Sequence, residues 1–337
     1  MKICVFGAGA LGSVFGGHLA LGGEDATMIA RGVTLATLKA NGLRLIAGDT
    51  ERVVRPRVTD NPRELGVQDI VILATKAYSL PEAAEAIAPM LGPDTGVVLI
   101  QNGLQWWYFH GLGGALEGKR LSSIDAEGKC ERLIGLKRSI GAEIYCPAEV
   151  TAPGVVRHGP NPKIVMGEAS GAKTPRIEAL ASAFQKSGVT AEIAADMRLE
   201  LWKKLLNLVA GAPLAVLTGA TNKPLNREEG TRAIMARLTA ETIAVAAKVG
   251  VKLPLTALDR FKQPADVPPH KVSTLQDQER KRPLEIDAIV GVVAEIGRMT
   301  GVPTPTVDAV YALCRMKAVE LGLYPANPGF ALDYKIG

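Results

Sequence analysis

The chain opens with MKICVFGAGALGSVFGGHLALGGEDATMIAR, residues 1–31. A short apolar run at 2–6 leads into the glycine pattern Gly7-Ala8-Gly9-Ala10-Leu11-Gly12, and a second apolar run follows at 26–30. A strand, a G-x-G-x-x-G turn that opens a helix, and a second strand are typical of the βαβ unit that binds dinucleotides. The three glycines allow a tight turn, a close backbone approach to a pyrophosphate, and close packing of the helix on the strand. We therefore expect residues 7–12 to bind a pyrophosphate at the helix N-terminus.

The end of the second strand indicates which nicotinamide cofactor is used. NAD-selective sites carry Asp or Glu about 20 residues past the glycine pattern, where it accepts a hydrogen bond from the ribose 2′-OH. Here Arg31 stands at that place, directly after Ala30. A guanidinium can pair bidentately with a 2′-phosphate. The sequence therefore favours NADP(H), with a solvated surface arginine as the alternative.

Length and composition narrow the class of protein. The chain has 337 residues, enough for about two domains, and its 47% hydrophobic and 22% charged residues are ordinary for a folded soluble protein. The net charge of +5 is spread along the chain without a basic stripe interleaved with aromatics, so we expect no nucleic-acid partner. The four cysteines and four histidines are scattered, which predicts no metal site. With neither a signal peptide nor an apolar run of membrane-spanning length, the expected location is cytoplasmic.

Strands and helices alternate after the opening unit. An apolar run at 69–75 ends at Lys76, a helix is expected over 79–90, and the apolar run 96–100 ends just before Asn102. This alternation predicts an α/β fold with a Rossmann-type doubly wound sheet, in which ligands bind beyond the strand C-termini. Lys76 and Asn102 both follow such ends. Two strand-like runs lie near 43–46 and 52–58; four more, at 139–146, 154–158, 163–166 and 190–193, are expected to extend the sheet.

The segment 104–136 shows no regular pattern. It begins with Trp106-Trp107-Tyr108-Phe109 and continues through a glycine-rich stretch. A structureless segment of this length is unusual inside a domain and is often functional. The aromatic cluster could form a lid or one wall of a pocket, and packing or a dimer contact are the alternatives.

The character of the sequence changes near residue 195. Apolar residues recur at helical offsets in 229–249 and 285–299, and Thr304-Pro305 is a typical start for a last helix. We therefore expect a nucleotide-binding domain at 1–194 and an all-α substrate and catalytic domain at 195–337. The cleft between two such domains is the default place for an active site.

A reductase also needs a proton donor for the carbonyl oxygen. The first helix of the second domain offers two adjacent lysines, Lys203 and Lys204. A lysine ammonium is protonated at pH 7, so it can stabilise a developing alkoxide and then donate to it. The pattern alone does not choose between the two, and most helix lysines are merely solvated.

Several motifs in order resemble one family over nearly the whole chain, the ketopantoate reductases (2-dehydropantoate 2-reductases). The motifs that carry the resemblance are the glycine pattern 7–12, Arg31, Lys76, Asn102-Gly103, W-x-K-L at 202–205, Pro213-Leu214, Asn222, Ser273-x-x-x-Asp277 and Glu285-Ile-Asp287.

The resemblance implies a role for each matching position. Lys204 would be the proton donor, Asn102 would touch both cofactor and substrate, and Lys76 would lie near the cofactor. Asn222 and Ser273 would bind substrate together with Lys204. Glu285 would be a catalytic residue on the ribose side of the cofactor. Without the resemblance, capping or turn roles would be favoured for Asn222 and Ser273, and Glu285 would suit a helix N-terminus.

The chain also departs from the family. Members typically carry asparagine four and eight residues after the catalytic lysine, whereas this chain has Leu208 and Ala212 there and Asn207 one place early. Each lost amide removes about 1 kcal/mol of binding to a polar substrate. Either a helix irregularity brings Asn207 inward, or the substrate is less polar than ketopantoate, as the Trp106-Trp107 pair also suggests.

The function expected from the sequence is NADPH-dependent reduction of a 2-oxo acid, 2-dehydropantoate to pantoate, with hydride from the nicotinamide and a proton from Lys204. One alternative is a reductase of a bulkier or less polar 2-oxo acid. The other is a non-catalytic NADP(H)-binding regulatory protein. The expected partner is the small 2-oxo acid, with no nucleic acid or membrane, and the sequence is compatible with a homodimer.

Overall fold

The computed structural model describes residues 1–254, 256, 259, 270–325 and 330–334. The chain divides into two compact units. The sheet unit comprises 1–101, 105–120 and 128–197, and the helical unit comprises 102–104, 121–127 and 198–337. The main change between them falls after Met197, close to the boundary expected at 194. The sequence did not indicate that two short segments of the first half belong to the helical unit.

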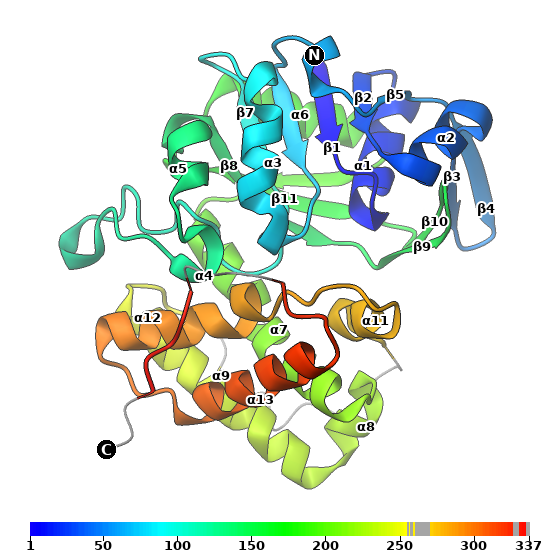
Figure 1. The fold of residues 1–337 in the computed structure, drawn as a ribbon. Helices are drawn as coiled ribbons and strands as arrows, with labels where there is room; N and C mark the ends of the chain where they lie inside the picture. The colour runs from blue at the N-terminus through cyan, green and yellow to red at the C-terminus, as the bar shows by residue number, and fades with distance from the viewer. Residues whose placement is uncertain (255, 257–258, 260–269, 326–329, 335–337) are drawn as a thin grey trace. The chain divides into compact units, whose positions relative to one another are not determined.

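An eight-stranded sheet forms the centre of the sheet unit, as expected for a doubly wound fold (Figure 1). Its order is β12-β11-β8-β7-β6-β1-β2-β5, and β11 is antiparallel to β8 while the other pairs are parallel. Phe6 lies beside Ile29 and Leu73, and Leu73 beside Leu99, so four strands end at one edge. The strands are β1 (Lys2–Phe6), β2 (Asp25–Ile29), β5 (Arg57–Thr59), β6 (Ile70–Leu73), β7 (Gly96–Leu99), β8 (Ser139–Tyr145), β11 (Lys163–Glu168) and β12 (Thr190–Ile193).

Helices cover both faces of this sheet. On one face α1 (Ala10–Leu21) and α6 (Pro175–Lys186) pack together, with the rings of Phe15 and Phe184 5.5 Å apart. On the other lie α3 (Leu80–Ile87) and α5 (Lys129–Leu133), drawn in front of the sheet in Figure 1. A parallel sheet covered on both faces explains why its strands are continuous apolar runs.

A second, four-stranded sheet corrects part of the sequence interpretation. Its order is β4-β3-β10-β9, with β3 (Leu43–Ala47), β4 (Thr50–Val54), β9 (Ala148–Ala152) and β10 (Val155–His158). The expectation that 154–158 extends the main sheet is therefore wrong, because β10 pairs in parallel with β3. The run 52–58 is likewise two strands, β4 and β5. They are separated at Pro56, which has no N–H to donate to a ladder.

The helical unit contains α7 (Met197–Thr218), α8 (Asn222–Arg227), α9 (Glu229–Lys248), α11 (Ser273–Glu279), α12 (Val292–Thr300) and α13 (Pro305–Glu320). The expected helix over 285–299 is not uniform, because its first turn, η6 (Asp287–Gly291), is a π-helix. Among the described helices, α7 is long and apolar enough to cross a membrane by length and composition. Within this helix, 61% of an apolar 18-residue stretch is buried inside the protein, as in the core helix of a globular unit.

The segment 104–136 is folded rather than structureless. Trp106, Trp107, Tyr108 and Phe109 are all buried in the sheet unit, at most 2% exposed. The indole N–H of Trp107 donates to Gln105 Oε1 at 2.8 Å, and Gln105 Nε2 donates to Leu99 O at 2.8 Å. Further along, α4 (Ser122–Asp125) belongs to the helical unit. The aromatic cluster is therefore core packing, which was one of the alternatives.

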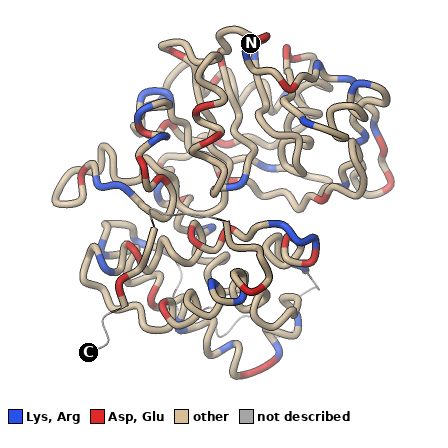
Figure 2. The backbone as a smooth tube through the Cα atoms, in the orientation of Figure 1, with Lys and Arg blue, Asp and Glu red and all other residues tan. Residues whose placement is uncertain are grey.

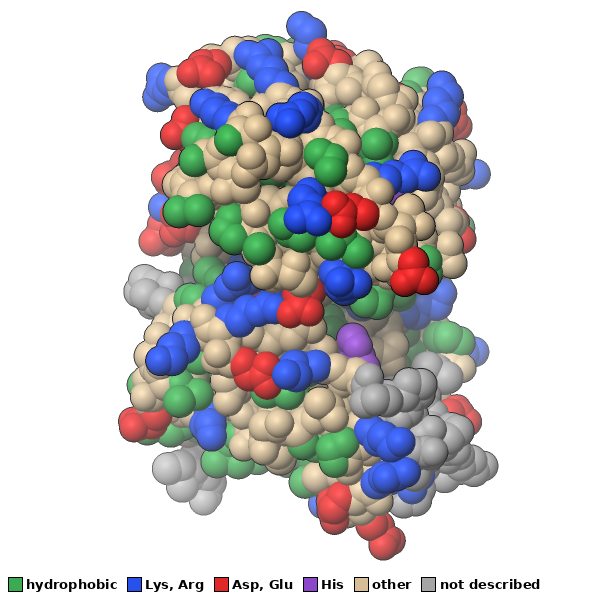
Figure 3. All heavy atoms as spheres, turned by 90° about the vertical axis from the view of Figure 1, so that its right-hand side faces the viewer, with side chains coloured by type: hydrophobic (Ala, Val, Ile, Leu, Met, Phe, Trp, Pro, Cys, Tyr) green, Lys and Arg blue, Asp and Glu red, His purple; other side chains and the backbone are tan. Residues whose placement is uncertain are grey.

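Charges of both signs are mixed along the described chain (Figure 2), and one face of the surface shows them scattered among apolar and neutral side chains (Figure 3). No group of three or more metal-ligating side chains occurs among the described residues.

Candidate active site

The glycine pattern forms the turn between β1 and α1. Gly7 has a φ of +111°, and a Cβ there would lie 2.9 Å from Ala74 O. A Cβ on Gly12 would lie 1.9 Å from Gly7 O, whereas one on Gly9 would meet nothing within 4 Å. The fold itself therefore requires Gly7 and Gly12, while the space beside Gly9 is open. No side chain caps α1 at Gly9, so its first N–H groups suit a pyrophosphate, and the residues present fit a dinucleotide.

Two cations follow the ends of the strands on either side of β1. Arg31 comes two residues after β2, caps the start of α2 (Gly32–Asn41), and is exposed. Within the described part of the chain no carboxylate forms an ion pair with it. Lys76 follows β6, is half-buried and precedes the short helix η2 (Ala77–Ser79). An exposed guanidinium at the end of β2 fits a 2′-phosphate.

Asn102 and Glu285, 183 residues apart in sequence, meet in the helical unit. Asn102 Nδ2 donates to Glu285 Oε2 at 3.3 Å, and Glu285 is 6% exposed. Gly103, with a φ of +94°, lies against the first turn of η6, where an added Cβ would be 2.0 Å from Ala288 O. The Asn102-Gly103 dipeptide therefore combines the amide that bonds Glu285 with the one residue type that can approach η6 this closely.

The two lysines of α7 differ in their surroundings. Lys203 Nζ lies 2.7 Å from Glu200 Oε1, one turn earlier, with 39% of its side chain exposed. This is an ordinary pair on a helix surface. Lys204 is half-buried, as Lys203 is, and lies on a different side of the helix, as expected for an adjacent position.

Asn222 and Ser273 begin two short helices. Asn222 is the first residue of α8, where its Oδ1 accepts from His270 N at 2.5 Å and its own N donates to His270 O at 3.1 Å. Ser273 is the first residue of α11 and is exposed. Asn222 thus holds a neighbouring segment through its Oδ1 and backbone N, a role of the turn kind.

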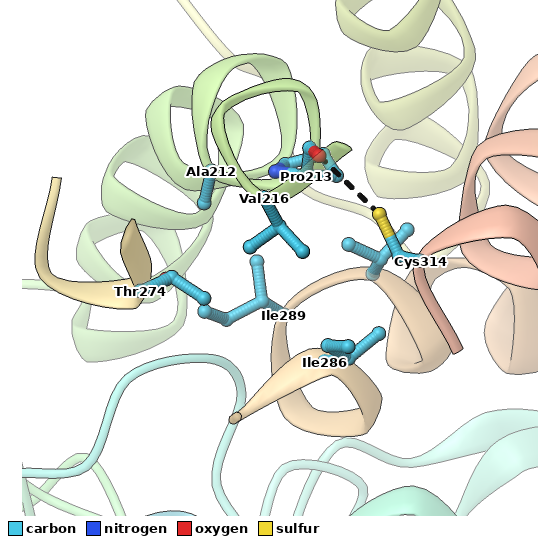
Figure 4. Close-up of a pocket in the computed structure, with 8 residues that line it drawn as sticks. Ala212, Pro213, Val216, Thr274, Ile286, Ile289 and Cys314 are labelled. Carbon is cyan, nitrogen blue, oxygen red and sulfur yellow. Dashed lines mark hydrogen bonds between the residues drawn. The ribbon is translucent and has the colours of Figure 1, made fainter. Parts of the chain in front are cut away.

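Leu208 and Ala212 stand on α7 at the positions where family members typically carry asparagine. The helix continues through this region without interruption, and Asn207 is exposed, its Nδ2 donating back to Lys203 O at 3.2 Å. The alternative in which a helix irregularity brings Asn207 inward is therefore wrong. Ala212 instead lines a small apolar cavity of about 10 Å³ within the helical unit (Figure 4). Its other lining residues are Pro213, Val216, Thr274, Ile286, Ile289, Val290 and Cys314.

A buried polar cluster two residues beyond Glu285 was not identified from the sequence. Asp287 Oδ1 accepts from Tyr311 Oη at 2.8 Å, and Asp287 Oδ2 accepts from Tyr324 Oη at 2.9 Å. Burial raises the pKa of Tyr311, and the charge of Asp287 raises it further. The same two causes raise the pKa of Tyr324. Both phenols are therefore fixed as donors. The Glu285-Ile-Asp287 motif contained the acid, but tyrosines on distant segments gave no signal.

Comparison with known proteins identifies one family. The family model "Ketopantoate reductase PanE/ApbA" matches residues 3–107, and its C-terminal counterpart matches 196–318. The 2-dehydropantoate 2-reductase of Mesorhizobium japonicum is 45% identical over 96% of this chain and 100% of its own length.

Solved structures show the same relationship. A candidate ketopantoate reductase from Ralstonia solanacearum has a TM-score of 0.90 and 36% identity, covering 96% of this chain and 99% of that one. The PanE/ApbA family ketopantoate reductase from Ralstonia eutropha has a TM-score of 0.82 and 28% identity, covering 96% and 100%.

The family match, on a Rossmann-type fold, places the chain in the class of NADP-dependent oxidoreductases that act on CH–OH groups and small 2-oxo acids. Within that class, this chain belongs to the ketopantoate reductase family.

Proposed function

We propose that this protein reduces 2-dehydropantoate to pantoate with NADPH. The observation that carries the proposal is the contact between Asn102 and Glu285, two positions that the family resemblance assigned to the site and that meet at 3.3 Å. The Mesorhizobium relative named 2-dehydropantoate 2-reductase matches this chain along its full length, which supports the same reaction.

The proposed cofactor contacts follow the strand ends of the sheet unit. Residues Gly7, Ala8, Gly9, Ala10, Leu11 and Gly12 hold the pyrophosphate through backbone N–H groups at the start of α1. Arg31 pairs with the 2′-phosphate, and Lys76 lies near the cofactor. Asn102 and Glu285 contact the nicotinamide ribose side. When bound, NADPH supplies the hydride for the keto carbon.

The proton comes from the protein. Lys204 stabilises the charge that develops on the substrate oxygen and donates a proton from Nζ to it. Glu285 and Asn102 fix the reacting geometry, and Asn222 and Ser273 bind the remainder of the substrate.

The test is to follow NADPH oxidation with 2-dehydropantoate and a panel of other 2-oxo acids. We expect Lys204→Ala to lower kcat by about 10²–10⁴-fold, the range for a general acid. Lys203→Ala is the matched control, because Lys203 is paired with Glu200 on the helix surface and should leave kcat nearly unchanged. No turnover of any 2-oxo acid by the native protein would refute the function, and equal losses in both variants would refute the role of Lys204.

A second function is favoured by one specific feature, the apolar positions Leu208 and Ala212. At these two positions, a 2-oxo acid with a bulkier or less polar side group would lose less binding free energy than 2-dehydropantoate. The same panel separates the two functions. The second one fails if 2-dehydropantoate has by far the highest kcat/KM.

The proposal extends to surroundings and partners. We propose a cytoplasmic enzyme whose partner is its small substrate, without nucleic acid or membrane, and a homodimer is compatible with it. Size-exclusion chromatography with light scattering would measure the assembly state.

A further inference from the structure

Glu285 stands between two attachments to one segment of the helical unit. On one side, Leu284 N donates to Leu323 O at 2.9 Å. On the other, Asp287 accepts from Tyr324, the residue directly after Leu323, at 2.9 and 3.1 Å. A residue held on both sides by neighbouring anchors has little freedom to shift along the chain.

Asp287 also holds the unusual turn that follows Glu285. It is the first residue of the π-helix η6, and it is 7% exposed. The phenol of Tyr311, on α13, donates to it at 2.8 Å. The Tyr311 ring lies against η6 again at Gly291, where an added Cβ would be 3.0 Å from the ring. Isolated π-turns within α-helices are frequent at functional sites, and they need outside contacts because their geometry is otherwise unfavourable.

The same turn also positions Asn102, through the contact of Gly103 with η6. Gly103 packs on the carbonyl of Ala288, the second residue of η6, and Asn102 thereby reaches Glu285. The position of η6 therefore determines both members of the Asn102–Glu285 pair. Asp287 is the polar residue that ties η6 to α13 and to the 323–324 segment.

From these contacts we propose that Asp287 is a positioning residue for the reaction, held by Tyr311 and Tyr324, and that it sets the geometry of Glu285 and Asn102. This inference rests on the proposed function for the catalytic effect. Its structural part, the placement of residues 102–103 and 285 by Asp287, does not depend on which substrate is reduced. Arg315, whose guanidinium lies 4.9 Å from the centre of the Tyr324 ring, supports the outer tyrosine.

The loss of activity in each variant should follow the number of hydrogen bonds to Asp287 that it removes. Tyr311→Phe and Tyr324→Phe each remove one donor and keep the ring. Asp287→Asn keeps one acceptor oxygen, and Asp287→Ala removes both. We expect kcat for NADPH oxidation to fall by about tenfold in the single phenylalanine variants and about 10²-fold in Asp287→Ala, because misplacement by about 1 Å costs about that much. Asp287→Asn should recover part of the loss, and KM should change by less than about threefold.

The matched control is Thr242→Val, which removes a fully buried hydroxyl of α9 whose hydrogen bond, to Leu238 O at 2.7 Å, stays within its own helix. It should leave kcat unchanged. If the Asp287 and tyrosine variants lower Tm but keep native kcat, the residue is merely structural and the proposal is overturned.

Amide hydrogen exchange of the full-length protein gives a result that does not require activity. We expect peptides covering 102–105 and 286–291 to exchange faster in Asp287→Asn than in the native protein, and to be unchanged in Thr242→Val. Native protection of 102–105 in Asp287→Asn overturns the proposal even when the native enzyme turns over. If the native protein reduces no 2-oxo acid, the proposed function fails, and this exchange measurement alone still decides whether Asp287 positions the pair.

Discussion

Replacing Gly103 by alanine is expected to disable the Asn102–Glu285 pair without removing any functional group. A Cβ at Gly103 would lie 2.0 Å from Ala288 O, whereas real Cβ atoms essentially never come closer than 3.0 Å, so the backbone must move by at least 1.0 Å (3.0 − 2.0). That shift is carried directly to Asn102, whose amide is already 3.3 Å from Glu285. A misplacement of about 1 Å lowers turnover by about 10²-fold.

A second cost of Gly103→Ala is the backbone itself. At a φ of +94°, a non-glycine residue pays about 1–2 kcal/mol. Gly250→Ala is the matched control, because Gly250 has a φ of +84° in the same unit and nothing within 4 Å of its added Cβ. Both variants should lose stability in urea unfolding, and Gly103→Ala alone should lose about 10²-fold in kcat for NADPH oxidation. If the two variants have kcat values within about threefold, the close approach to Ala288 does not position Asn102.

The remaining predictions concern single side chains. Arg31→Asp should reduce the ratio of kcat/KM for NADPH over NADH by at least about tenfold, since a charge-assisted contact to phosphate is lost; an unchanged ratio would show that the 2′-phosphate is recognised elsewhere. Burial lowers the pKa of His18 below its usual 6.5, helped by the charge of neighbouring His158. Because the unfolded chain then binds the proton more readily, His18 contributes stability that is complete above 6.5 and is lost as the pH falls through the lowered pKa. Tm measured at about pH 7.5 and about pH 5.5 should therefore differ less in His18→Gln than in the native protein, and equal differences would contradict this. Asn222→Asp keeps the oxygen that accepts from His270 but loses the amide donor, so KM for 2-dehydropantoate should rise about tenfold with kcat nearly constant; an unchanged KM would leave Asn222 with its turn role only.

Sequence reasoning predicted the backbone where it depends on local order. The glycine pattern at 7–12 and Arg31 each belong to one turn or strand end, so spacing alone predicted their places in the fold. The second sheet could not be predicted in this way, because β10 pairs with β3, more than a hundred residues earlier. Neither strand has a sequence pattern that indicates which strand it pairs with. The sequence left the packing of the cluster around Trp107 as one of several alternatives for another reason. Its backbone is irregular, and periodicity cannot distinguish a buried irregular segment from an exposed loop.

The candidate site shows the same division. The motif Glu285-Ile-Asp287 identified an acid, but the partners of Asp287 lie on α13 and on the 323–324 segment, each fixed by tertiary packing. The helical pattern also treated Lys203 and Lys204 alike, and only the family resemblance pointed to Lys204; the structure adds the ion pair of Lys203 with Glu200.

Under the proposed function, the apolar turns of α7 leave recognition of a polar substrate to other elements of the helical unit. With Leu208 and Ala212 at the usual amide positions, α7 has no donor there, and exposed Asn207 bonds its own helix. A hydroxyl on the substrate must then bond elsewhere, since a polar group left unpaired in a closed site costs about 1–3 kcal/mol. Among the described residues Asn222 suits this role: His270 N fixes its Oδ1 as an acceptor, so its Nδ2 can only donate. If Asn222 contacts the substrate as proposed, its amide requires an acceptor there, and the hydroxyl oxygen of 2-dehydropantoate is one.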